Sequence, residues 1–98
     1  MTRFLANLRA AVYDEHEAAV IDWAIRAATE RIGADGRVAY DHGEYLPSER
    51  RFLAWFDAED ASLIQQVAAT AQLVGVVVSE VIALDEGPGG ADSFARAG

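Results

Sequence analysis

The fold is decided by residues 37–57, RVAYDHGEYLPSERRFLAWFD. Residues 37–46 place alternate side chains on two faces with a period of two, which is typical of a β-strand. Residues 47–50, Pro-Ser-Glu-Arg, are turn formers, and the aromatic-rich residues 51–57 return as a second strand. This stretch therefore predicts a β-hairpin in the middle of the chain.

A helix is predicted on each side of the hairpin. Before it, apolar residues recur at helical spacing in residues 15–32, with Asp14 and Glu17 in a capping arrangement at the start and Gly33 at the end. After it, residues 57–60 offer N-caps for a second helix. The apolar stripe of that helix is formed by Leu63, Ile64, Val67, Ala68 and Ala71.

Two further strands complete the pattern. Residues 3–8 precede the first helix, and the β-branched residues 74–84 follow the second. The resulting order, β-α-β-β-α-β, predicts a ferredoxin-like α+β fold, in which a four-stranded antiparallel sheet carries both helices on one face. Right-handed crossovers place the first and third strands at the centre of that sheet.

The last predicted strand is apolar on both faces, which is typical of a strand that is covered on both sides. Because two helices cover one face of the sheet, the other face needs a different cover. We predict a homodimer in which two sheets pack face to face as a dimeric α+β barrel, with a cavity between them.

The length of 98 residues fits a single domain, which we place at residues 1–85, followed by a flexible C-terminal tail at residues 86–98. A net charge of −8 argues against nucleic acid and against an anionic membrane surface as partners. Without cysteine the chain has no disulfide or thiolate site, and its longest apolar run, residues 73–78, is too short to span a bilayer. We therefore predict a cytoplasmic protein.

The hairpin also carries candidate functional residues. With the turn centred on residues 48–49, we expect position 42 to pair with 55, position 44 with 53, and position 40 with 57. The side of the sheet without helices then carries Tyr40, His42, Glu44, Trp55 and Asp57.

A histidine beside carboxylates suits acid/base chemistry, so His42, Glu44 and Asp57 are candidate catalytic residues. Tyr40 and Trp55 are candidates for the walls of a substrate site. Each has a simpler interpretation: His42 and Glu44 as a solvated pair on an edge strand, and the two aromatic residues as ordinary packing. The residues predict no metal site and no cofactor.

Three short motifs lie within residues 44–81: Glu44-Tyr45-Leu46, Phe52-Leu53-Ala54-Trp55-Phe56-Asp57-Ala58 and Ser79-Glu80-Val81. With these motifs the chain resembles a family of small bacterial ferredoxin-like proteins of unknown function, some of which are called nickel-binding or nickel-responsive. The resemblance implies the fold, dimerisation and a nickel site. The chain departs from the family at Ala54, where cysteine is common, and at residues 72–74, Gln-Leu-Val, where the family has Gly-Leu-Pro.

Three functions are compatible with these features. The first is a cofactor-independent acid/base enzyme, such as a cyclase, isomerase or oxygenase of bacterial secondary metabolism, that binds an organic small molecule in the dimer cavity. The alternative, which the resemblance implies, is a non-catalytic nickel-binding protein. A third is a dimer that modulates another protein.

Overall fold

The computed structural model describes residues 1–84 and shows the predicted order of elements. The first three strands begin and end within one residue of their predicted bounds. The tail predicted at residues 86–98 lies outside the described residues, as does the domain boundary at residue 85. The elements are β1 (Thr2–Leu8), α1 (Glu15–Ile32), β2 (Val38–Leu46), β3 (Arg51–Ala58), α2 (Ala61–Thr70) and β4 (Val76–Val81).

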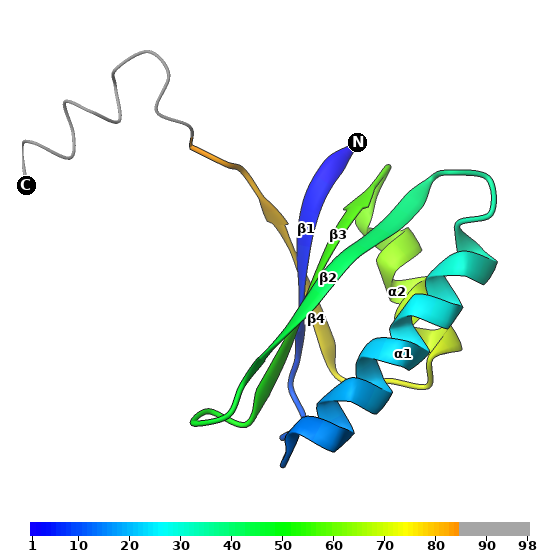
Figure 1. Cartoon of the computed structure of the whole chain (residues 1–98). Coiled ribbons are helices and arrows are strands. Elements are labelled where there is room, and N and C mark those ends of the chain that lie inside the picture. Colours follow the sequence, from blue (N-terminus) through cyan, green and yellow to red (C-terminus); the bar gives the residue numbers. More distant parts are fainter. Residues whose placement is uncertain (85–98) are drawn as a thin grey trace, which may run out of the picture.

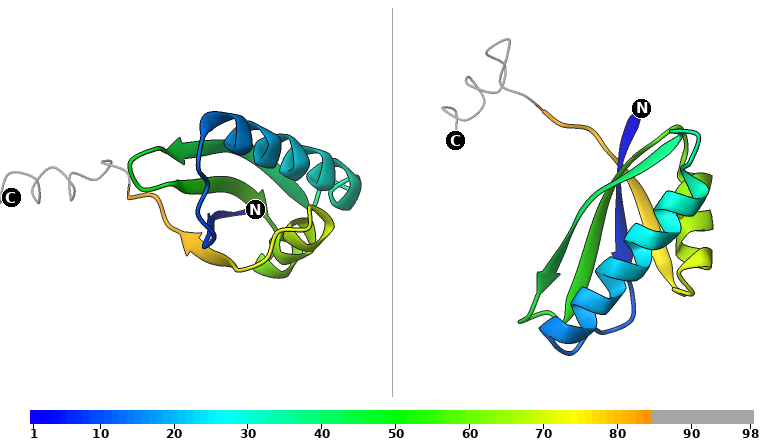
Figure 2. Two further views of the ribbon diagram at one scale, coloured as in Figure 1. Left: turned by 90° about the horizontal axis from the view of Figure 1, so that it is seen from below. Right: turned by 45° about the vertical axis from the view of Figure 1, so that its right-hand side comes forward.

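The sheet has the strand order β2-β3-β1-β4, and all neighbouring strands are antiparallel. β1 and β3 are therefore central, as predicted, and β2 and β4 form the edges. Figures 1 and 2 show both helices on the same side of the sheet, and no helix of residues 1–84 lies on the other side. The predicted ferredoxin-like α+β fold is confirmed.

Both helices begin at the predicted capping residues. The Asp14 carboxylate accepts a hydrogen bond from the Glu17 backbone N–H at 2.8 Å, and the Glu17 carboxylate accepts one from the Tyr13 N–H. Asp60 caps α2 by accepting from the Ser62 N–H at 2.8 Å. Neither helix is long and apolar enough to cross a membrane, within residues 1–84.

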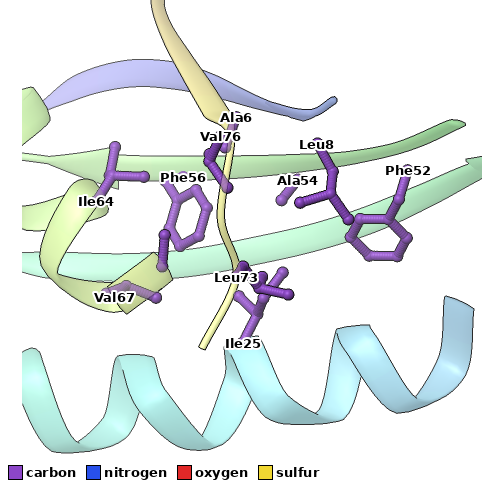
Figure 3. Close-up of a pocket in the computed structure, with 11 residues that line it drawn as sticks. Ala6, Leu8, Ile25, Phe52, Ala54, Phe56, Ile64, Val67, Leu73 and Val76 are labelled. Atoms are coloured by element: carbon purple, nitrogen blue, oxygen red, sulfur yellow. The ribbon is translucent and has the colours of Figure 1, made fainter. Parts of the chain in front are cut away.

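The hydrophobic core lies between the sheet and the two helices. Alternate side chains of β1 and β3 point to the helices and are buried. Figure 3 shows Phe56 from the sheet, Ile64 and Val67 from α2, and Ile25 from α1 pointing toward one another. The gap between them has a volume of about 20 Å³, which is room for one water-sized sphere. This gap is a packing defect of an apolar core and is too small for an organic ligand.

β4 is shorter than the predicted strand 74–84. Gly75 has a φ of +69°, which breaks the extended backbone just before Val76. At the other end the ladder with β1 stops where Val81 pairs with Arg3, near the start of β1. Within β4, Val76 and Val78 pack against the core, whereas Val77 points to the other side and is 43% exposed.

Candidate functional site

The helix-free side of the sheet, which we call the open face, combines apolar and charged side chains. Residues that face each other across antiparallel strands point to the same side, so the pairing defines this face. It carries residues of all four strands: Arg3, Leu5 and Asn7 from β1, Ala39, Asp41, His42, Glu44 and Leu46 from β2, Arg51, Leu53, Trp55 and Asp57 from β3, and Val77, Ser79 and Val81 from β4.

The predicted hairpin pairing holds at two of its three positions. His42 pairs with Trp55 and position 44 pairs with 53, as expected. The predicted pairing of Tyr40 with Asp57 is wrong, because a β-bulge between positions 40 and 42 shifts the register by one residue. Tyr40 therefore pairs with Phe56 and points to the helices.

Tyr40 is part of the contact between β2 and α1 and does not lie on the open face. Its hydroxyl donates a hydrogen bond to the Asp22 carboxylate of α1 at 2.6 Å, and its ring lies 5.1 Å from that of Phe56. Burial and this hydrogen bond raise the pKa of the Tyr40 hydroxyl well above its ordinary value. The proposed role of Tyr40 as a wall of a site on the helix-free side is therefore withdrawn.

Gly43 permits this close contact between β2 and α1. A Cβ atom at position 43 would lie 2.5 Å from Cζ of Phe52 and would also collide with the Tyr40 hydroxyl. We expect Gly43→Val to lower the free energy of unfolding by about 1–3 kcal/mol through overpacking. The control is Ala10→Val, at an exposed position between β1 and α1, with an expected change within about 0.5 kcal/mol. Urea unfolding measures both, and equal effects would contradict this account.

The bulge places the Asp41 carboxylate on the open face, where it joins a chain of ionic hydrogen bonds. Arg3 donates from Nη2 to Asp41 at 2.7 Å and from Nη1 to Asp57 at 3.3 Å. His42 Nδ1 lies 2.8 Å from Asp41, and its Nε2 lies 3.0 Å from Glu44. We call these five residues, which run in the order Asp57, Arg3, Asp41, His42, Glu44, the ionic chain.

Two residues of the ionic chain, Arg3 and Asp41, were not predicted from the sequence. The predicted grouping of Asp57 with His42 is wrong, because Asp57 contacts Arg3 and not His42. The carboxylate partners of His42 are instead Asp41 and Glu44. Arg3 could have been found from the sequence by pairing β1 with β3, because this pairing places Arg3 opposite Asp57 and opposite charges at facing strand positions attract.

Trp55 lies beneath the ionic chain. The His42 ring stacks on the Trp55 indole with centroids 6.2 Å apart and planes inclined by 20°, and the Arg3 guanidinium lies 5.7 Å from the indole centroid. The indole Nε1 is buried and has no hydrogen-bond partner among the described residues. Trp55 therefore contacts charged neighbours from both adjacent strands, β1 and β2.

The hydrogen bonds around His42 favour its charged form. Hydrogen bonds to Glu44 and then to Asp41 raise the pKa of His42, and they lower the pKa values of both carboxyl groups. An imidazolium donates from both ring nitrogens, whereas a neutral imidazole donates from one. These hydrogen bonds thus favour His42 as a proton donor, whereas the sequence suggested a neutral proton acceptor.

We expect the stability of the fold to depend on pH through this cluster. The raised pKa of His42 means that its contribution is present below about pH 6.5 and is lost as pH rises through the folded pKa. The lowered pKa values of Asp41 and Glu44 mean that their contributions are present above about pH 4.5 and are lost in acid. Urea unfolding should show the largest difference in the free energy of unfolding between the wild type and His42→Asn in the range from about pH 4.5 to 6.5. A difference that does not depend on pH would contradict this.

No cluster of three or more histidine, aspartate and glutamate side chains within residues 1–84 could hold a metal ion. The two carboxylates at His42 bind its ring nitrogens, and those nitrogens are the atoms that a metal would need. Nickel binding stays a prediction from the resemblance of residues 44–81. Retention of nickel through gel filtration by protein without a histidine tag would test it.

Comparisons with known proteins show the fold. No protein-family model matches the chain, and no curated protein sequence does. Among solved structures, the chain is similar to SCO4226 from Streptomyces coelicolor A3(2), with a TM-score of 0.65 and 14% sequence identity. The match covers 85% of this chain and 99% of that one, so nearly the whole of that protein shares the arrangement of β1 to β4 seen here.

Proposed function

We propose that the protein is a homodimer in which the open faces of two copies meet and enclose a site for a small organic molecule. The observation that carries this proposal is the make-up of the open face. Leu5, Leu53 and Val77 lie around Asn7 on this face, no helix of residues 1–84 covers them (Figure 1), and the ionic chain borders them. An apolar sheet face of this kind is normally covered by another layer.

The charges of the open face favour a second copy of this chain as the cover. The chain as a whole carries a net charge of −8, so two copies repel over most of their surface. On the open face, three cations balance three carboxylates when His42 is protonated. Such a balanced face is self-complementary in a twofold dimer, in which each charge meets a different residue of the partner. The charges of this face are Arg3, His42, Arg51, Asp41, Glu44 and Asp57.

The chemistry of the site follows from His42 and Trp55. Trp55 supports the His42 ring by stacking on it, and the charged His42 can give a proton to a developing negative charge on a ligand. Asp41 and Glu44 hold the imidazolium, while Asp57 holds Arg3 against Asp41. This arrangement supports proton-transfer chemistry of the cyclase or isomerase type without a cofactor.

Light scattering and binding of anilinonaphthalenesulfonate, a fluorescent apolar anion, test this proposal together. We expect a molar mass of twice 10.5 kDa and probe fluorescence that rises with protein concentration. Leu53→Asn should weaken probe binding, because it removes apolar surface from the open face. The matched control, Val20→Asn, lies on the exposed side of α1 and should bind the probe like the wild type. A monomeric mass, or equal binding by the two variants, would overturn the proposal.

A further inference from the structure

Glu44 lies between two hydrogen-bond donors on the open face. Its carboxylate contacts His42 Nε2 at 3.0 Å, and the nearby Trp55 indole N–H contributes to lowering the pKa of Glu44. The indole N–H nevertheless lacks hydrogen-bond geometry to any acceptor among residues 1–84 and is buried. Because position 44 is diagonal to position 55 across the β2–β3 ladder, the long Glu44 side chain can reach either donor.

The two carboxylates at His42 differ in how firmly they are held. Asp41 accepts a second hydrogen bond from Arg3 at 2.7 Å, and Arg3 in turn binds Asp57 on β3. Glu44 has no second hydrogen-bond partner in the described part of the chain. The Trp55 indole N–H is a donor near it that has no acceptor. These groups, Asp41 and Glu44 on β2, Arg3 on β1 and Asp57 on β3, are the charged residues around His42.

Loss of a proton from His42 leaves one ring nitrogen as an acceptor. If that nitrogen is Nδ1, it faces the oxygen of Asp41, which Arg3 holds in place. If it is Nε2, it faces Glu44, which is free to turn away. The second arrangement avoids the repulsion between two acceptors, so the remaining proton stays on Nδ1.

We propose that His42, Glu44 and Trp55 form a proton-operated switch. When His42 is protonated, Glu44 binds its Nε2. When the proton leaves to solvent, the Glu44 carboxylate moves to the unpaired indole N–H of Trp55, and the open face loses one positive charge. The switch sets the charge of the proposed ligand site, and this consequence rests on the proposed function. The switch itself needs neither a ligand nor a second copy.

The fluorescence of Trp55 tests the switch. Trp23→Phe leaves Trp55 as the one tryptophan of the chain, and a protonated imidazole stacked on an indole quenches its emission. We expect emission to rise in one step with pH, with a midpoint above 6.5. In the same background, His42→Asn should abolish the step, whereas His16→Asn, which changes the other histidine, should leave it unchanged.

The indole N–H resonance in ¹⁵N-labelled Trp23→Phe protein tests the movement of Glu44. We expect it to shift downfield over the same pH step, because a hydrogen bond to a carboxylate deshields the proton. Glu44→Gln should remove most of this shift and should move the fluorescence midpoint down toward 6.5, since a charged partner of His42 is lost. A midpoint at or below 6.5, or a Glu44→Gln variant that titrates like its parent, would overturn the switch.

Light scattering on the same samples separates the switch from the proposed function. A monomer that shows both spectral changes supports the switch and overturns the proposed dimer. A dimer whose Trp55 signals do not titrate overturns the switch and leaves the dimer in place.

Discussion

Val77→Asp is expected to convert the proposed dimer into monomers. Val77 points to the open face and is 43% exposed in the single subunit, so in the proposed dimer its side chain is covered by the partner. An unpaired carboxylate buried there costs about 1–3 kcal/mol or more, and it occurs twice in each dimer. Since 1.4 kcal/mol corresponds to a tenfold change in the dissociation constant, we expect dimerisation to weaken by at least about 25-fold.

Light scattering over a dilution series measures this effect, and circular dichroism shows whether the subunit is still folded. The control is Val20→Asp, which adds the same charge at a comparably exposed valine on α1 and should leave the dimer intact. Val78→Asp serves as a contrast, because Val78 packs against the core, and we expect that variant to unfold. A folded Val77→Asp protein that dimerises like the wild type would show that the open face is not the interface.

Phe56→Ala should lower the free energy of unfolding strongly. Phe56 is 2% exposed, lies at the centre of the core between the sheet and α2, and contacts the Tyr40 ring. Truncating a buried phenylalanine to alanine costs about 3–5 kcal/mol, because the lost contacts leave a cavity. That loss is a large part of the total stability expected of a chain of this size.

Urea unfolding measures the loss, and Phe56→Leu provides a graded comparison. Leucine keeps most of the apolar volume, so its variant should lose clearly less stability than the alanine variant. A loss below about 1 kcal/mol for Phe56→Ala would mean that position 56 does not face the helices, as a one-residue slip of the hairpin would produce.

The sequence was sufficient to predict the fold because its local signals agree. Helical spacing, the capping residues Asp14 and Asp60 and the turn at residues 47–50 each mark a boundary that the structure shows. The end of β4 was not predicted, because apolar residues such as Ile82 continue the strand pattern beyond the last residue with a partner on β1. A strand ends where its pairing with the neighbouring strand ends, and that depends on register rather than composition.

The candidate site was predicted in part, because its residues are brought together by strand register, and the sequence predicted that register correctly on one side of the bulge only. His42, Glu44, Trp55 and Asp57 share the open face because the hairpin turn fixes their pairing. The bulge leaves no mark in the alternation of residues 37–46, so the position of Tyr40 could not be foreseen. Arg3 was missed because its neighbours come from the pairing of β1 with β3, which joins residues more than 50 positions apart in the chain.

The bulge in β2 also shows how this surface can change over evolution. The pairs on either side of it, Tyr40 with Phe56 and His42 with Trp55, are those of a regular ladder from which Asp41 is left over. Gain or loss of a single codon at this point would add or remove one carboxylate while every other side chain keeps its face. A scaffold of this kind can acquire an acidic group beside a histidine in one genetic step, without disturbing the core that keeps it folded.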